Sequence, residues 1–139
     1  MSILLHMDKF LLDAYESTTY QVVDPEISLK IGKTSEELGL LPVELNISSF
    51  CFITAYNPFS KELSYTENSK RQVLLAEDLR SYKFFKGVGI PSDKAWSPEP
   101  SFLVVGISKV YSIELAKKYE QNAIVLGSIG QEAELLITV

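Results

Sequence analysis

The order of strand-like and helix-like runs predicts an α+β fold with a ferredoxin-like split βαβ core. From residue 50 onward the runs follow as β-α-β-β-α-β plus one extra C-terminal strand. Several strand-like runs are apolar on both alternating faces, which is typical of strands covered on two sides. A ferredoxin-like sheet leaves one face open, so we expect the helical and hairpin segment of residues 1–46 to cover that face. A homodimer partner is the other candidate for this cover.

The N-terminal segment predicts a short helix followed by a hairpin. Residues 7–16 place apolar and aromatic side chains at near-helical spacing, and a polar stretch follows them. Residues 20–23 and 27–31 are short β-like runs on either side of a turn at Pro25, which removes a backbone donor. Residues 34–45 begin with a helix-capping pattern, but an internal glycine and proline limit this helix to a turn or two.

The remaining segments predict the rest of the sheet and two more helices. The expected strands are residues 50–56, 82–90, 102–107, 122–126 and 134–139. A capping box of Ser64 and Glu67 starts a long helix over residues 65–82, and Ser108 caps another over residues 109–119. The second of the strands contains two glycines, which predict a bulge or a close backbone approach. We expect this strand to lie at an edge of the sheet.

The length of 139 residues predicts one domain over residues 1–139, with residues 50–139 as its core. The net charge of -5 produces a field that repels phosphate backbones and disfavours general nucleic-acid binding. The sequence shows neither a basic signal-peptide region nor a long apolar stretch. We therefore expect a cytoplasmic protein without a membrane span.

The single cysteine and the single histidine limit the available chemistry. Cys51 lies in an apolar run, where a small buried hydrophobe is favoured over a nucleophile. His6 and Cys51 cannot form a zinc site within one chain, whereas a carboxylate-bound magnesium ion stays open. The sequence has no phosphate-binding glycine loop, and no metal or cofactor is expected.

Polar residues from separate segments are expected to meet at one edge of the sheet. On the helix of residues 65–82, Asn68 and Arg71 project close to the buried stripe, so partners should await them in the interior. In the split βαβ order, the strands that begin near residues 101 and 122 start beside the end of the strand at residues 50–56. The expected ligand-binding residues are Asn57, Asn68, Arg71, Glu99, Gln121 and Asn122.

This polar group has a structural and a functional interpretation. In the structural one, Arg71 pairs with Glu99 while the amides bind backbone groups that proline-rich turns leave unpaired. In the functional one, Arg71 offers a permanent charge to the carboxylate or phosphate of a ligand, and Glu99 is a base or a hydrogen-bond acceptor. Trp96 in the loop of residues 91–100 either pins that loop to the domain or stacks on a ligand or partner.

The same residues carry a resemblance to a known family. Its pieces, in order, are Ile53-Thr54-Ala55-Tyr56-Asn57-Pro58, Glu67-Asn68 with Arg71, Glu99-Pro100-Ser101 and Gln121-Asn122-Ala123. Over about residues 50–139 the chain resembles the bacterial domain-of-unknown-function family numbered 3293. Glu120 stands where the resemblance leads us to expect glycine. The family has no established activity, so the resemblance implies a bacterial origin and no particular chemistry.

These observations favour a small binding or regulatory domain that holds a small anionic or polar ligand, or a partner peptide, beside Arg71. The first alternative is a hydrolase or transferase with Glu99 as the general base and with Arg71 and Asn68 stabilising developing charge. The lack of a nucleophile–base pair or a set of metal ligands counts against an enzyme. The second alternative is an assembly protein that recruits another chain through an exposed sheet face or strand edge.

Overall fold

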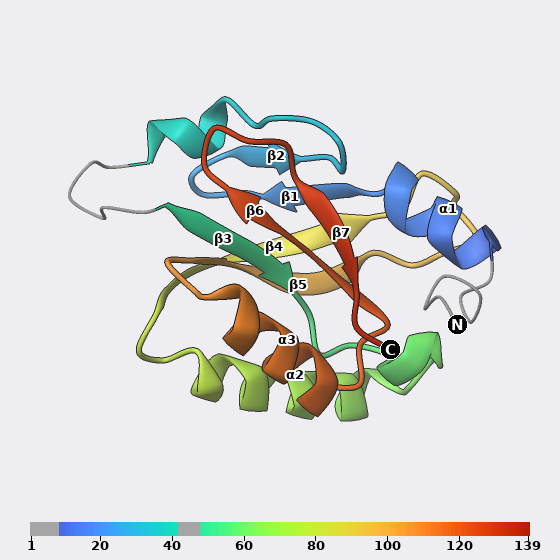
Figure 1. Ribbon diagram of the computed structural model, residues 1–139. Coiled ribbons are helices and arrows are strands. Elements are labelled where there is room, and N and C mark those ends of the chain that lie inside the picture. Colours follow the sequence, from blue (N-terminus) through green and yellow to red (C-terminus); the bar gives the residue numbers. More distant parts are fainter. Residues whose placement is uncertain (1–8, 42–47) are drawn as a thin grey trace.

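The computed structural model describes residues 9–41 and 48–139, which form one antiparallel seven-stranded sheet with three α-helices (Figure 1). The strands lie in the order β2-β1-β4-β5-β3-β6-β7, and the sheet curls into a half-barrel. The helices are α1 (Lys9–Ser17), α2 (Tyr65–Asp78) and α3 (Lys109–Lys118). The strands are β1 (Thr19–Val22), β2 (Ile27–Leu29), β3 (Ser49–Ile53), β4 (Lys83–Ile90), β5 (Glu99–Val105), β6 (Ala123–Ser128) and β7 (Glu134–Ile137).

The two longer helices begin at the predicted caps. The Ser64 hydroxyl oxygen accepts the backbone N–H of Glu67 at 3.1 Å and donates to its carboxylate at 3.0 Å. The Ser108 hydroxyl oxygen accepts the backbone N–H of Tyr111 at 3.1 Å. The starts of α2 and α3 are therefore confirmed, although α2 ends at Asp78, before the predicted end at residue 82.

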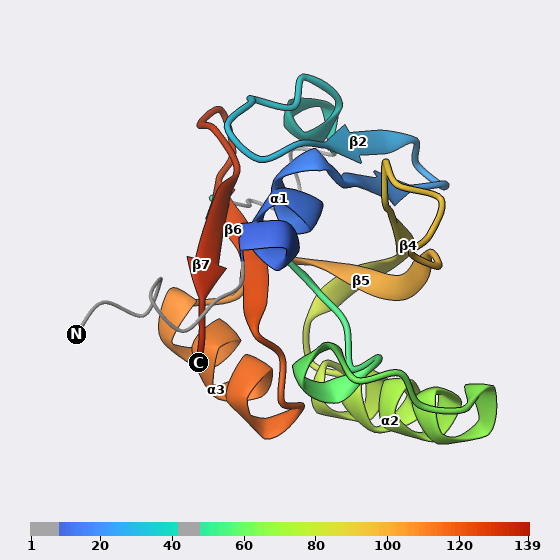
Figure 2. The ribbon, with the colours of Figure 1, turned by 90° about the vertical axis from the view of Figure 1, so that its right-hand side faces the viewer.

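One face of the sheet packs against α2 and α3 (Figures 1 and 2). Ile53 of β3 and Val104 of β5 point to this face, together with Leu75 of α2 and Leu115 of α3. All four side chains are almost completely buried. This contact removes the apolar stripe of each helix from water, which is the main contribution of such packing to stability.

The opposite face is enclosed by the curl of the sheet itself. Phe52 of β3, Leu103 of β5 and Val125 of β6 point to this side, where they meet Val22 of β1 and Leu29 of β2. Successive side chains of a strand point to opposite faces, so the neighbours of the residues facing the helices form this second core. The prediction that these strands are apolar on two covered faces is confirmed.

The predicted ferredoxin-like core with an N-terminal segment lying over one face is wrong. Instead of forming a separate layer, β1 pairs with β4 and β2 pairs with β1, so this segment extends the sheet. The two ends of the extended sheet then meet. The N–H of Gly32 donates to the carbonyl of Ala133 at 2.8 Å, and the N–H of Ala133 donates to the carbonyl of Lys33 at 3.0 Å. The curvature of one antiparallel sheet covers the second face. Of the predicted fold, only the α+β class agrees with the structure.

The position predicted for residues 82–90 at an edge is also wrong, because β4 lies inside the sheet between β1 and β5. The predicted close approach is confirmed at Gly87. A Cβ atom at Gly87 would lie 2.7 Å from the Gln21 carbonyl oxygen and 2.9 Å from Cε2 of Phe52. Glycine therefore allows β1 and the Phe52 ring to approach β4 closely.

The smaller N-terminal predictions have mixed outcomes. β1 and β2 form the predicted hairpin. The helix predicted over residues 7–16 is present as α1, whereas residues 7 and 8 lie outside the described residues, as does His6. Of the turn or two predicted within residues 34–45, the structure shows the 3-10 helix Glu37–Leu40, and residues 42–45 are not among those described. Within the described ranges, no helix has the length and apolar character needed to cross a membrane.

Candidate functional site

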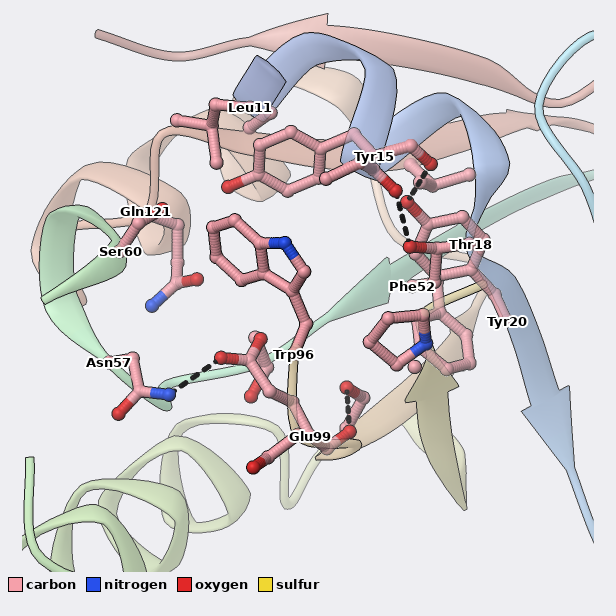
Figure 3. A pocket seen from close by; sticks show the side chains of 18 of the residues that line it. Leu11, Tyr15, Thr18, Tyr20, Phe52, Asn57, Ser60, Trp96, Glu99 and Gln121 are labelled. Atoms are coloured by element: carbon pink, nitrogen blue, oxygen red, sulfur yellow. Dashed lines mark hydrogen bonds between the residues drawn. The ribbon is translucent and has the colours of Figure 1, made fainter. Parts of the chain in front are cut away.

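A cavity of about 510 Å³ lies where α1, the ends of several strands and the loop between β4 and β5 come together (Figure 3). The connection after β3 also contributes to it, through Asn57 and Ser60. The volume is within the usual range for sites that bind small molecules. The cavity is therefore large enough to be a candidate binding site.

Glu99, the first residue of β5, is the half-buried carboxylate of this cavity. Its Oε2 atom accepts a hydrogen bond from Nδ2 of Asn57 at 2.8 Å. Among the described residues, this amide is the single hydrogen-bond donor to the carboxylate. Burial raises the pKa of Glu99, and the hydrogen bond from Asn57 opposes that rise.

The Asn57 amide is oriented by a second asparagine. Nδ2 of the buried Asn68 donates to Oδ1 of Asn57 at 2.7 Å, and the backbone N–H of Leu63 donates to the same oxygen at 3.0 Å. The backbone N–H of Asn57 donates back to Oδ1 of Asn68 at 2.8 Å. Because Oδ1 of Asn57 already accepts two donors, its Nδ2 is directed at Glu99. Asn68 thus acts on the cavity through Asn57.

The connection that carries Asn57 has an unusual backbone. Asn57, Phe59 and Ser60 have φ angles of 49°, 50° and 60°, although none of them is glycine. The N–H of Phe59 donates to the carbonyl of Glu120 at 2.6 Å, which ties this turn to the residue after the C-cap of α3. Left-handed conformations of such residues cost free energy and persist only where the surrounding structure holds them.

The other wall of the cavity comes from α1. Tyr15 of α1 lines the cavity together with Ser60, whose hydroxyl oxygen accepts a hydrogen bond from Nδ2 of Asn122 at 2.9 Å. Burial raises the pKa of the Tyr15 phenol; the neighbouring Ser60 side chain opposes this rise, and the charge of Glu99 adds to it. Trp96 also lines the cavity, and Figure 3 shows its indole pointing into the space between these walls.

Arg71 lies outside the cavity lining and uses its donors on neighbouring elements. Its Nε donates to the carbonyl of Ala55 at 2.7 Å, and its Nη2 donates to the carbonyl of Tyr119 at 2.5 Å. Its ion pair is with Glu120, at 3.4 Å from Nη1 to Oε1, and not with Glu99. These contacts tie α2 to the end of β3 and to the end of α3.

The structure therefore divides the six predicted residues. Asn57, Glu99 and Gln121 line the cavity. The other three contact the residues around it: Asn68 hydrogen-bonds to Asn57, Asn122 donates to the Ser60 hydroxyl oxygen, and Arg71 links α2 to the end of α3. Nε2 of Gln121 donates to the carbonyls of Tyr56 and Tyr119 at 3.0 and 3.1 Å. The expectation that these residues bind a ligand stays a prediction.

Tyr15 is a cavity residue that sequence reasoning missed, since its spacing served only to predict the helix of residues 7–16. α1 has no fully buried residue, so its inward side lines an open space. No local pattern distinguishes these two environments, because both place the same side chains on one side of a helix. The proline-rich loop did suggest Trp96, which is 43% exposed.

Fold and site together define an α+β protein with a curled antiparallel sheet and a cavity lined by polar and aromatic side chains. The chain matches the family described as "Protein of unknown function (DUF3293)" over residues 53–124, just over half of its length. It therefore belongs to this family, and the predicted resemblance is confirmed. Comparison with curated proteins gives no match, and comparison with solved structures gives none either. The matched residues include all six predicted site residues, whereas α1 with Tyr15 lies before them.

Proposed function

We propose that this protein is a small binding domain that holds a polar small molecule in the cavity beside Glu99. The observation that carries the proposal is the environment of this carboxylate, which is half-buried in a 510 Å³ cavity with one amide donor among the described residues. A buried carboxylate costs free energy unless donors surround it. A ligand that supplies the missing donors would offset this cost and gain affinity from it.

The contacts of Arg71 do not support the predicted role of this residue in binding an anionic ligand. Its guanidinium donates to two backbone carbonyls and pairs with Glu120, so it supports the scaffold around the cavity. Glu99 and Asn57, which lie inside, provide the polar contacts instead. A role in holding a partner peptide, a homodimer, the bacterial origin and a cytoplasmic location all stay predictions.

A thermal-shift screen of small polar metabolites, followed by calorimetry, tests this proposal. We expect hits whose affinity falls at least about tenfold in Glu99→Gln and in Trp96→Ala, which corresponds to about 1.4 kcal/mol. Glu77→Gln is the matched control, because this carboxylate of α2 is exposed and lies outside the cavity lining. Hits that bind both cavity variants as tightly as the wild type would place the ligand elsewhere and overturn the proposal.

An enzyme remains the second candidate, since the burial that raises the pKa of Glu99 also suits a general acid or base. The Tyr15 phenol lines the same cavity and could hydrogen-bond to a reacting group. Any turnover found among the hits should then fall by about a hundredfold or more in Glu99→Gln. Full turnover in this variant would remove Glu99 from the chemistry while leaving the binding proposal intact.

A further inference from the structure

The charges around the cavity restrict the class of ligand, if the proposed binding function holds. The side chains that line it include two carboxylates, Glu99 and Glu62, and no lysine, arginine or histidine among the described residues. Glu99 is half-buried and Glu62 is exposed. An anion in this space would meet like charge in a partly desolvated setting without a counter-charge, which is unfavourable.

Two acceptor oxygens of residues that line the cavity receive no hydrogen bond from the described residues. Oε1 of Glu99 has no donor among the described residues. Nε2 of Gln121 donates to two backbone carbonyls, and Oε1 of Gln121 accepts no hydrogen bond from the described residues. An ionised carboxylate only accepts hydrogen bonds, and so does the oxygen of an amide. A ligand that supplies donors would satisfy these two oxygens, and a positively charged donor forms the stronger bond to a carboxylate.

Aromatic side chains complete the lining around these acceptors. Trp96 and Tyr15 line the cavity with Glu99, and Phe52, from the core enclosed by the curl, lies at its apolar part. The faces of indole and phenol rings attract cations, and they also pack against apolar groups. The cavity thus combines a carboxylate, aromatic faces and an apolar surface.

We propose that the cavity takes an organic monocation, a protonated amine whose ammonium group contacts Glu99 and whose apolar part lies against Trp96 and Phe52. The ammonium group supplies three donors and the charge that Glu99 lacks. The apolar part buries surface that the cavity exposes to water. This inference rests on the proposed function and names the class of ligand for the same site.

Three probes of nearly equal size and different charge test the inference: phenethylamine, phenethyl alcohol and hydrocinnamate. Trp96 is the chain's single tryptophan, so its indole N–H signal in a ¹H-¹⁵N spectrum of the full chain reports on the cavity without ambiguity. We expect phenethylamine to shift this signal saturably, with a Kd at least about tenfold lower than that of the alcohol. Hydrocinnamate should leave the signal in place.

Two conservative variants locate the preference. Glu99→Gln should reduce the ratio of the alcohol and amine Kd values to about one. Glu62→Gln removes the same charge from the exposed carboxylate and should keep most of the preference, because exposed charges are screened. A preference lost equally in both variants would indicate a diffuse field and overturn the contact with Glu99.

Three further outcomes would overturn the cation class: alcohol binding as tight as amine binding, a preference retained in Glu99→Gln, or an indole signal that none of the probes shifts. These outcomes are distinguishable from a failure of the proposed function. A neutral compound from the metabolite screen whose affinity depends on Glu99 and Trp96 would leave binding in the cavity intact and refute only the charge. Hits indifferent to both residues would refute the cavity itself.

Discussion

Glu99 shows at the scale of one residue how a candidate site affects stability. Its pKa is raised by burial, with the Asn57 hydrogen bond opposing the rise, so the folded state holds its proton more tightly than the unfolded state does. The cost of the buried charge is absent below the ordinary value of 4.5, grows as the pH rises from there to the folded pKa, and is constant above the folded pKa. Residues kept for function often reduce stability in this way.

We therefore expect Glu99→Gln to unfold at a higher temperature than the wild type at pH 7. The difference should shrink as the pH is lowered toward 4.5, because the wild-type carboxyl then becomes neutral too. Glutamine keeps an oxygen that can accept the Asn57 amide, so the local hydrogen bond survives the change. Thermal unfolding at a series of pH values measures the effect, and a variant less stable than the wild type at pH 7 would contradict it.

Glu120 is the residue at which the family resemblance led us to expect glycine. It follows the C-cap of α3 with a φ angle of 56°, the left-handed conformation that glycine adopts without steric cost. Its half-exposed carboxylate pairs with Arg71. Glutamate thus accepts backbone strain and gains a surface ion pair, which contributes about 0–1 kcal/mol.

Comparing Glu120→Gly with Glu120→Ala separates the strain from the ion pair. Both substitutions remove the carboxylate, but only glycine relieves the strain. We expect the glycine variant to be about 1 kcal/mol more stable than the alanine variant in urea denaturation. Equal midpoints for the two variants would show that the backbone at this position is not strained.

At the scale of elements, Arg71 joins three segments through its contacts. It donates to the carbonyls of Ala55 after β3 and Tyr119 after α3, while its own backbone belongs to α2. Removing the guanidinium takes the side-chain donor from the Ala55 carbonyl and one of two side-chain donors from the Tyr119 carbonyl, which keeps Nε2 of Gln121. In a partly buried place, an unmade hydrogen bond is costly.

Arg71→Leu should lower the free energy of unfolding by about 2–4 kcal/mol. Arg80→Leu is the matched control, because Arg80 is 75% exposed and its ion pair with Glu77 contributes little. Denaturation in urea measures both. If Arg71→Leu keeps its stability and instead loses the binding of hits from the metabolite screen, Arg71 is a ligand residue and our assignment of it to the scaffold is wrong.

The approach of β1 to β4 depends on Gly87. A methyl group there would meet the Gln21 carbonyl oxygen of β1 at 2.7 Å and the ring of Phe52 at 2.9 Å. Gly87→Ala should therefore cost about 1–3 kcal/mol, as overpacking of a core does. Gly89→Ala is the control on the same strand, since its Cβ would lie 3.8 Å from the nearest atom, a methyl carbon of Thr18. Equal urea midpoints for the two variants would contradict the close approach.

At the scale of the whole molecule, one sheet separates two cores. Leu75 lies in the core under α2 and α3, and Leu103 lies in the core enclosed by the curl; both are fully buried. The central strands supply residues to both sides, so the loss of one core should disrupt the other. The predicted single domain thus implies one cooperative unit.

Leu75→Ala and Leu103→Ala should each cost about 2–5 kcal/mol, because each removes a large side chain from a packed interior. Each variant should keep a single unfolding transition that coincides for far-UV circular dichroism and Trp96 fluorescence. Two separate transitions, with only one of them shifted by each variant, would show that the two cores unfold independently.

Local patterns predicted the parts of this fold that depend on neighbours in the chain. Ser64 and Ser108 start their helices because a capping hydroxyl acts within three residues. The alternation along β3 and β5 predicted two buried faces, since strand geometry alone sends successive side chains to opposite sides. Asn57 and Glu99, which the antiparallel order of β3 and β5 placed close together, do form a hydrogen bond.

What covers the second face could not be read from the sequence. An overlying segment and a curl of the sheet bury the same apolar residues. Only the pairing of β1 with β4 and the backbone hydrogen bond between Gly32 and Ala133 distinguish these two arrangements. The positions of two site residues could not be read from the sequence either. Tyr15 lines the cavity from α1, and Arg71 donates to backbone carbonyls instead of lining the cavity. Periodicity and capping act over a few residues, so the sequence by itself determined the elements and their buried faces. The curl and the cavity depend on contacts between distant segments, so only the tertiary structure decided them.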